Sequence, residues 1–372
     1  MRGGDVVSSS AAGWTRLSFL DRFLPIWIVL AMGTGLALGW LWPELGALLD
    51  RVQVLNVSVP IAAGLFWMMY PVLARVRYDA IPRHVRNRRF LGTSLLLNWV
   101  LGPIVMFSLA WLLLPDLPAY RDGLILIGLA RCIAMVLIWN SLAGGSNELA
   151  AVLVALNSIF QIATYSLLAW LSLAVVPGWL GLPGAALDIS VWTIATNVLL
   201  FLGLPLLAGY LTRRVLVARR GLAWYDGIFL PKFGPTALIG LLYTVVLMFA
   251  MQGDRILALP LDVVRIAAPL LVYFGFMFAL ALVLARWLRF AYPAGVSLAF
   301  TAAGNNFELA IAVAVATFGL GSGEALAAVV GPLVEVPALV GLVYVARWSR
   351  RYFPLEWEPG IAAPKIVAAS DA

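Results

Sequence analysis

Charged residues are scarce in this chain: they make up 12% of its 372 residues, whereas 63% are hydrophobic. A soluble domain carries roughly 25% charged residues and about 45–50% apolar ones. So few charges cannot cover a surface that faces water, which argues against a soluble enzyme or a soluble binding module. The lipid bilayer is therefore the expected solvent for most of the surface.

Cysteine and histidine are nearly absent as well, with one of each. Cys132 alone cannot form an internal disulfide or a multi-cysteine metal site, and His84 alone excludes a histidine-based metal site. The motifs HExxH and GxSxG are missing, and His84 falls in an arginine-rich connector, far from Cys132. We therefore expect neither an enzyme nor a sensor, and no cofactor.

Long apolar runs are what the chain has in abundance. A membrane-spanning helix needs about 20 mostly apolar residues. The sequence predicts ten such runs, at 23–43, 54–74, 90–114, 122–143, 147–176, 189–212, 233–252, 263–285, 292–318 and 324–347. The first run is too long for a signal peptide and lacks a clear cleavage site, so we expect it to remain as a helix.

Lysine and arginine cluster on one side of these runs. If the N-terminus is cytoplasmic, twenty of them fall in cytoplasmic segments, one (Arg131) lies in a span, and four fall outside, namely Arg51, Arg121, Arg255 and Arg265. This bias predicts a multi-pass protein of the cell (inner) membrane with both termini cytoplasmic. The net charge of +7 then reflects topology, and nucleic acid is not an expected partner.

Ten runs divide into two halves of five. The predicted organisation is a cytoplasmic tail (1–22), a first repeat (23–176), an extracytoplasmic connector (177–188), a second repeat (189–347) and a cytoplasmic tail (348–372). An odd number of spans per half gives the halves opposite orientations, as in many secondary transporters. The openings Gly-Ser-Asn-Glu at 145–148 and Gly-Ser-Gly-Glu at 321–324 agree, although a shared serine cap and first-turn glutamate explain them equally well.

Polar residues within the spans are the functional candidates, because they are costly in lipid. The run Ala-Ala-Gly-Asn-Asn at 302–306 weakens a helix, so we expect it to face the protein interior or a water-filled cavity. If the helix continues instead, Thr301, Asn305 and Glu308 share one face. Asn305 and Asn306 then contribute either to a substrate site or to a hydrogen-bond cluster between helices.

Glu308 is the candidate proton carrier, since a carboxylate in a low-dielectric setting takes up protons more readily. The alternative is a salt bridge to Arg131. Glu335, which follows Gly331-Pro332, is either a transport residue or a polar strut.

Cys132 admits two interpretations before any comparison. A free cysteine is usually a small buried hydrophobe. The neighbouring Arg131 would favour its thiolate, although successive helical side chains point in different directions. Asn140, Asn157 and Gln161 add further polarity to spans four and five.

Three blocks of this sequence resemble the arsenite-efflux permeases of the bile acid/arsenite/riboflavin transporter superfamily. The first spans 130–161 and contains Arg-Cys-Ile-Ala-Met-Val at 131–136; the second is 300–310 and the third 330–337. The blocks occur in order and in the expected spans, and the resemblance covers about residues 20–350.

The resemblance implies an all-α polytopic fold with ten transmembrane helices, in two inverted five-helix repeats with interrupted helices four and nine that cross. It implies export of arsenite, with antimonite as a further candidate, driven by proton entry. The key residues of that family fall on Cys132, as the As(III) ligand, and on Glu308, for proton coupling.

The chemistry is consistent with this implication. Arsenite is a small trihydroxide and arsenic(III) is thiophilic, so one thiolate gives the weak, reversible bond that a carrier needs. Asn305, Asn306 and Asn140 are candidates to bind the substrate hydroxyls, supported by Arg131, Glu335, Thr301 and Asn157. The alternative is a sodium-coupled carrier of an organic anion from the same superfamily, which needs no thiol.

Overall fold

The computed structural model describes residues 23–49, 51, 53–54, 57–76, 87–182, 190–319 and 321–353. The predicted tail 1–22, residues 183–188 of the connector, His84 and residues 354–372 of the second tail lie outside the described residues.

Helices account for nearly all of the described chain. They are α2 (Leu24–Leu41), α3 (Glu44–Leu49), α4 (Val59–Ala74), α6 (Arg88–Leu96), α7 (Gly102–Leu113), α8 (Pro118–Leu129), α9 (Val136–Leu142), α10 (Asn147–Trp170), α11 (Val176–Trp179), α12 (Val191–Val198), α13 (Leu204–Arg220), α14 (Leu222–Trp224), α15 (Leu230–Phe233), α16 (Thr236–Ala258), α17 (Pro260–Trp287), α18 (Tyr292–Ala303), α19 (Phe307–Phe318) and α20 (Gly323–Ser349). Strands β1 (Gln53–Val54) and β2 (Val57–Ser58) form one short antiparallel hairpin.

Six continuous helical segments are long and apolar enough to cross a membrane. They are Arg88–Leu113, Asn147–Trp179, Val191–Arg220, Leu222–Met251, Pro260–Trp287 and Gly323–Tyr352. Shorter apolar helices occupy Ile26–Leu41, Val59–Ala74 and Phe307–Phe318. The prediction of an all-α multi-pass membrane protein is therefore confirmed.

The second predicted span, 54–74, begins too early. Its first residues belong to the β1–β2 hairpin, and α4 starts only at Val59, with Pro60 in its first turn. Proline lacks the amide hydrogen that a helix interior requires but fits the first turn, where that hydrogen has no helical partner. Apolar composition alone does not reveal this boundary.

Four of the long helices contain a π-helical turn just before a proline. The turns are Leu97–Leu101, Leu171–Val175, Leu199–Gly203 and Tyr225–Phe229, and the prolines are Pro103, Pro177, Pro205 and Pro231. A proline ring clashes with the carbonyl four residues earlier and cannot donate to it. The wider turn accommodates that carbonyl, so each helix continues through its proline.

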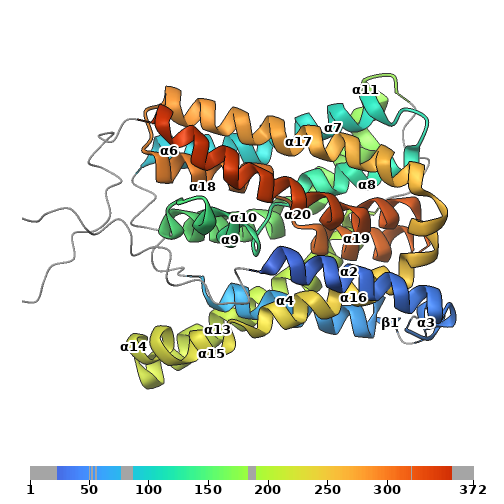
Figure 1. Cartoon of the computed structure of the whole chain (residues 1–372), viewed down its shortest axis with the longest axis horizontal. Helices are drawn as coiled ribbons and strands as arrows, with labels where there is room; N and C mark the ends of the chain where they lie inside the picture. The colour runs from blue at the N-terminus through green and yellow to red at the C-terminus, as the bar shows by residue number, and fades with distance from the viewer. Residues whose placement is uncertain are drawn as a thin grey trace, which may run out of the picture.

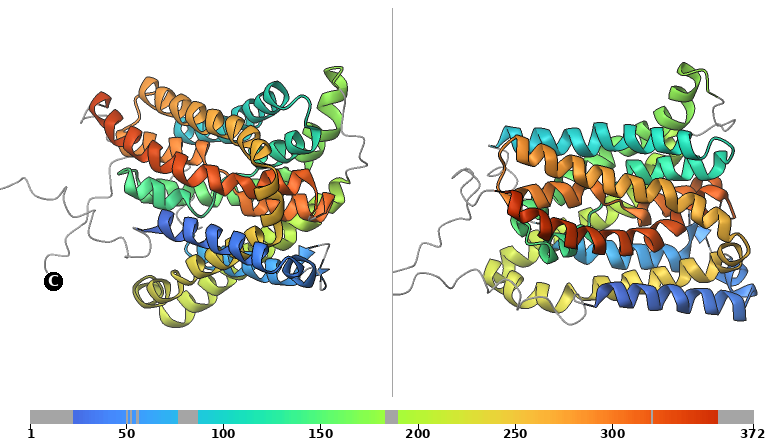
Figure 2. Two further views of the ribbon diagram at one scale, coloured as in Figure 1. Left: turned by 45° about the vertical axis from the view of Figure 1, so that its right-hand side comes forward. Right: turned by 45° about the horizontal axis from the view of Figure 1, so that its top comes forward.

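The helices form two groups that lie side by side in Figure 1 and, from other angles, in Figure 2. One group contains α2, α4, α13 and α16, and the other contains α7 to α10 and α17 to α20. Small residues bring the first group into close contact: a Cβ on Gly35 of α2 would lie 2.6 Å from the carbonyl oxygen of Val246 on α16. Such glycine-mediated packing is typical of membrane helices.

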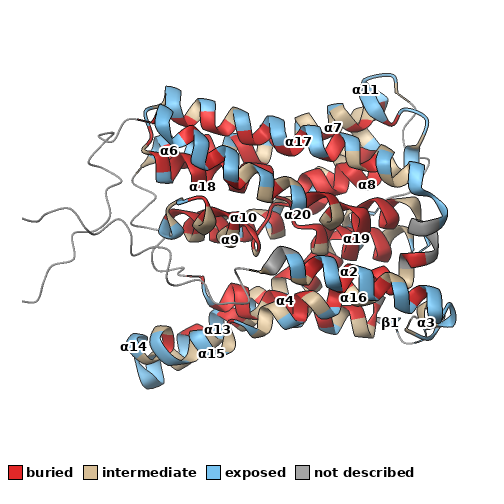
Figure 3. Cartoon of the chain, viewed as in Figure 1, coloured by how far each residue is buried: buried red, intermediate tan, exposed pale blue. Residues whose placement is uncertain are grey.

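Burial is strongest in the second group, where α8, α18, α19 and α20 meet (Figure 3). Every residue of α18 except Pro293 is buried. The chain leaves the helical conformation at two places in this region, between α8 and α9 and between α18 and α19, inside the predicted runs 122–143 and 292–318. These two breaks position the candidate site.

Candidate functional site at the crossing of two broken helices

The two non-helical segments cross as a short antiparallel pair. Arg131 and Asn305 form a β-bridge, with the Cys132 amide donating to the Gly304 carbonyl at 3.3 Å and the Asn306 amide donating to the Ala130 carbonyl at 3.0 Å. Four helix ends therefore meet at one buried point. We refer to residues 130–132 and 304–306 as the crossing.

Asparagine side chains satisfy the helix ends at the crossing. Asn305 Nδ2 donates to the carbonyl of Ile127 (2.8 Å), in the last turn of α8, and to that of Ala130 (3.1 Å), which follows this turn. Asn306 Oδ1 accepts from the Leu309 amide at 3.1 Å and so caps α19. Unwound backbone in a membrane protein needs such internal partners, because lipid offers none.

Arg131 is fully buried, and its guanidinium bonds to the C-terminal end of α8 directly and to that of α18 through Tyr273. Its NH2 group donates to the Gly128 carbonyl near the end of α8, and its NH1 group donates to the Tyr273 hydroxyl at 2.7 Å. Tyr273 in turn donates to the Ala302 carbonyl near the end of α18, at 3.4 Å. The carbonyls at a helix C-terminus carry a partial negative charge, so two helix ends balance the cation.

This arrangement argues against a salt bridge between Glu308 and Arg131, the alternative to a proton-carrying role for Glu308. Within the described residues, Arg131 and Glu308 form no ion pair, and the guanidinium is engaged by Gly128 and Tyr273 instead. Glu308 is half-buried in the first turn of α19, where the helix dipole favours a negative charge.

Cys132 lies at the crossing and is buried. It packs against Gly304: a Cβ added to this glycine would lie 3.0 Å from the Cys132 Cβ and 3.6 Å from its Sγ. Cys132 also lies within electrostatic range of Glu308 and Glu335, which interact with each other. The structure thus brings the predicted thiol and both predicted carboxylates together.

Glu335 of α20 bonds directly to the crossing. It is buried, and its Oε1 accepts from the Asn305 amide at 3.2 Å. On the opposite side, Gln161 of α10 accepts from the Arg131 amide at 3.0 Å and donates to the Arg131 carbonyl at 3.0 Å.

Two predicted residues bond elsewhere. Asn140 of α9 donates to Asn147 Oδ1 at 3.1 Å and accepts from the Ser297 hydroxyl at 2.9 Å, in a network that joins α9, α10 and α18. Thr301 donates to the Ser297 carbonyl at 2.7 Å, within its own helix. Neither side chain forms a hydrogen bond with the residues of the crossing.

Several buried polar atoms in this region have no hydrogen-bond partner among the residues that the structure describes. They are Arg131 Nε, Asn157 Nδ2, Asn305 Oδ1 and Asn306 Nδ2. Buried polar groups are nearly always satisfied, so these atoms indicate a place for polar ligand groups.

Sequence reasoning recognised Gln161 only as a polar residue and missed Tyr273. Gln161 lies four residues after Asn157, so both fall on one face of α10. This shared polar face is the feature of the sequence that could have indicated a role for Gln161. Tyr273 lies in an apolar helix, and no residue near it in the sequence indicates that it is the partner of Arg131.

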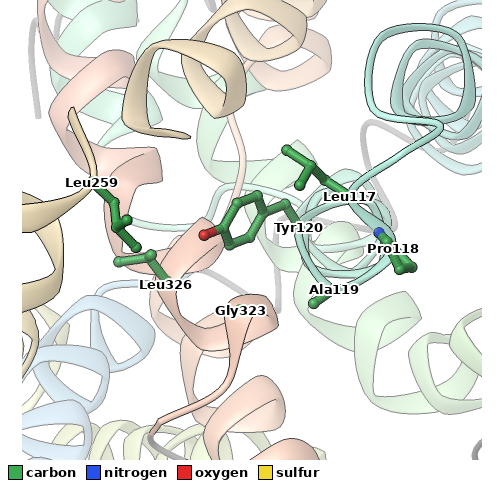
Figure 4. A pocket seen from close by; sticks show the side chains of 7 residues that line it. All are labelled: Leu117, Pro118, Ala119, Tyr120, Leu259, Gly323 and Leu326. Carbon is green, nitrogen blue, oxygen red and sulfur yellow. The ribbon is translucent and has the colours of Figure 1, made fainter. Parts of the chain in front are cut away.

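A pocket lies away from the crossing, at the first turns of α8, α17 and α20 (Figure 4). It is lined by Leu117, Pro118, Ala119, Tyr120, Leu259, Gly323 and Leu326. None of the predicted site residues lines it. No group of three or more His, Cys, Asp or Glu residues within the described ranges is placed to hold a metal ion.

Apolar helices broken around a buried polar crossing define a polytopic membrane transporter. Residues 62–259 match the model of the Sodium Bile acid symporter family. The Arsenical-resistance protein Acr3 of Corynebacterium glutamicum is 52% identical over 340 residues, which cover 91% of this chain and 92% of that protein.

Two further relatives are also similar to this chain over most of its length. The Arsenical-resistance protein Acr3 of Alkaliphilus metalliredigens is 32% identical over 91% of this chain and 95% of its own length. An uncharacterized transporter of Synechocystis is 36% identical over 93% of both chains. The chain therefore belongs to the arsenite-efflux permeases within the sodium bile acid symporter family, and it is a transporter and not an enzyme.

Proposed function

We propose that this protein exports arsenite from the cytoplasm by proton antiport. The observation that carries the proposal is the position of the chain's single cysteine: Cys132 lies at the crossing, within electrostatic range of two carboxylates and near several unpaired amide atoms. The relatives named for arsenical resistance support the same substrate class.

Arsenite chemistry fits one thiol better than several. Exchange of one arsenite hydroxyl for the Cys132 sulfur forms one As–S bond and releases one water, and addition of water reverses the step. Asn305 Oδ1 and Asn306 Nδ2 have no partner in the described part of the chain and are suited to the remaining hydroxyls. Antimonite has the same trihydroxide form and is a candidate second substrate.

Proton coupling is assigned to Glu308. In the inward-facing state its carboxylate and Cys132 help to bind arsenite, and proton uptake from outside releases the substrate after the switch. Glu335 supports the site through its bond to the Asn305 amide. Alternating access then exposes the crossing to each side in turn.

We further propose ten spans in two inverted five-helix repeats, in the cell (inner) membrane with cytoplasmic termini. The crossing supports the repeat: the Arg131 amide bonds to a residue 30 positions later, Gln161, and the Asn305 amide bonds to a residue 30 positions later, Glu335. Equivalent bonds at equivalent spacings are expected of two copies of one unit. The lysine and arginine distribution supports the orientation.

Everted membrane vesicles test the function. An interior-acid proton gradient should drive arsenite uptake, and dissipating that gradient should stop it. The alternative, a sodium-coupled carrier of an organic anion, shares the family model that this chain matches. Sodium-dependent transport that is indifferent to Cys132→Ser would favour that alternative and contradict our proposal.

A further inference from the structure

Two side chains fix the crossing from opposite sides, and they differ chemically. Gln161 on α10 makes two bonds to the backbone of Arg131, one to its amide and one to its carbonyl, both 3.0 Å long. Glu335 on α20 makes one bond, to the Asn305 amide at 3.2 Å. An amide group is both donor and acceptor, whereas an ionised carboxylate only accepts.

We propose that Gln161 is a positioning residue, which holds the backbone of Arg131 against α10 and thereby places the Cys132 thiol for arsenite. As far as arsenite is concerned, this inference rests on the proposed function. Among the described residues, Gln161 bonds to the backbone of Arg131 and not to Cys132, so it acts through that backbone.

The geometry explains why the effect reaches Cys132. The Arg131 carbonyl belongs to the peptide unit that joins Arg131 to Cys132, so fixing this oxygen fixes the plane from which the Cys132 backbone departs. The Cys132 amide, in the same unit, donates to the Gly304 carbonyl at 3.3 Å. Gln161 and Gly304 therefore hold the two polar atoms of one peptide unit.

Burial and the non-helical backbone of Arg131 increase the importance of the two Gln161 bonds. Gln161 is fully buried, and Arg131 lies outside any helix, so its backbone groups have no helical partner. Lipid offers no replacement for a lost bond at such a site. Tyr165, one turn further along α10, donates to the Leu126 carbonyl at 3.0 Å, so α10 is joined to the end of α8 at a second point.

The experiment uses the fact that Cys132 is the only cysteine, so a maleimide reports on this residue alone. Labelling rates are measured for the purified full-length protein and for Gln161→Met, which keeps the size of the side chain and removes both bonds. We expect the labelling rate to rise at least about tenfold, since loss of one buried hydrogen bond alone produces a population change of that size. The apparent affinity for arsenite should fall, while the amount of folded protein is unchanged.

A matched control comes from the same helix. Ser158 is buried, but its hydroxyl donates to the Val154 carbonyl within α10, at 2.8 Å. Ser158→Ala should therefore label and transport at the wild-type rate. If both variants label at the wild-type rate, the positioning role of Gln161 is wrong.

A second variant covers the case in which Gln161→Met does not fold. Gln161→Glu keeps the shape, offers both bonds when protonated and only one when ionised. Its labelling rate, taken relative to wild type at each pH, should be near one at low pH and rise at high pH. The titratable and charged groups around this position are Arg131 and Cys132 in the crossing and Tyr165 on α10, and Glu308 and Glu335 lie within electrostatic range of Cys132. Because these groups are present in both proteins, a ratio that stays near one above the pH at which the introduced carboxyl ionises would overturn the proposal.

The outcomes separate this inference from the function. If the labelling changes appear but the wild-type protein does not transport arsenite, the positioning role stands and the substrate assignment fails. If the wild-type protein transports arsenite and Gln161→Met changes neither transport nor labelling, the substrate assignment stands and the positioning role fails.

Discussion

At the residue scale, the buried guanidinium of Arg131 is held by neutral partners. It donates to Tyr273 and Gly128, and Tyr273 extends the network to Ala302. No carboxylate among the described residues bonds to this buried guanidinium. The negative end of α8 stabilises it directly and that of α18 through Tyr273.

Tyr273→Phe tests this network. The substitution keeps the ring but leaves a buried Arg131 donor unpaired, so we expect the free energy of unfolding to fall by about 1–3 kcal/mol. Tyr344→Phe is the control, since Tyr344 is 67% exposed. Thermal unfolding of the purified protein in detergent measures both. Equal midpoints for the two variants would show that the Tyr273 hydroxyl contributes nothing.

Glu308→Gln tests proton coupling. Glutamine keeps the size of the side chain but carries no titratable proton, so proton-driven arsenite uptake into everted vesicles should be lost. Glu44→Gln, at an exposed position in the first turn of α3, should transport at the wild-type rate. Wild-type transport by Glu308→Gln would exclude this residue as the proton carrier.

At the element scale, close helix contacts depend on particular glycines. Gly35 and Gly33 lie on the same helix, α2, but a Cβ on Gly35 would lie 2.6 Å from the Val246 carbonyl oxygen, whereas a Cβ on Gly33 would meet nothing within 4 Å. The first position therefore determines how closely α2 approaches α16.

Gly35→Ala should lower the free energy of unfolding by about 1–3 kcal/mol, the usual range for overpacking. Gly33→Ala should leave it unchanged or raise it slightly, because alanine is the better helix former. The two thermal midpoints, measured side by side in detergent, check this. A higher or equal midpoint for Gly35→Ala would mean that α2 and α16 are not in tight contact there.

The helices also show how much of the fold can be predicted from the sequence. Apolar length located the long helices, and the weak helix formers at 302–306 marked the break before α19. The start of α4 and the four π-helical turns were missed, because they depend on proline sterics within an apolar run. The family resemblance predicts roles for Cys132 and Glu308, but not for Gln161 or Tyr273, whose bonds are to residues far away in the sequence.

At the scale of the whole molecule, the charge bias predicts the topology. A reporter that is active only in the cytoplasm should be active when fused at the C-terminus and inactive when inserted in the connector 177–188. The two fusions differ only in where the reporter is attached, so each serves as the control for the other. The opposite pattern would invert the proposed direction of transport.

The central claim is that this protein exports arsenite through the Cys132 thiol. The most direct measurement is arsenic accumulation in an arsenite-sensitive bacterium that expresses the wild type, Cys132→Ser or neither, at matched protein levels. We predict that the wild type lowers cellular arsenic and that Cys132→Ser matches the cells without the protein. Accumulation in wild-type cells equal to that in cells without the protein would contradict the substrate assignment, and export by Cys132→Ser at the wild-type rate would contradict the role of the thiol.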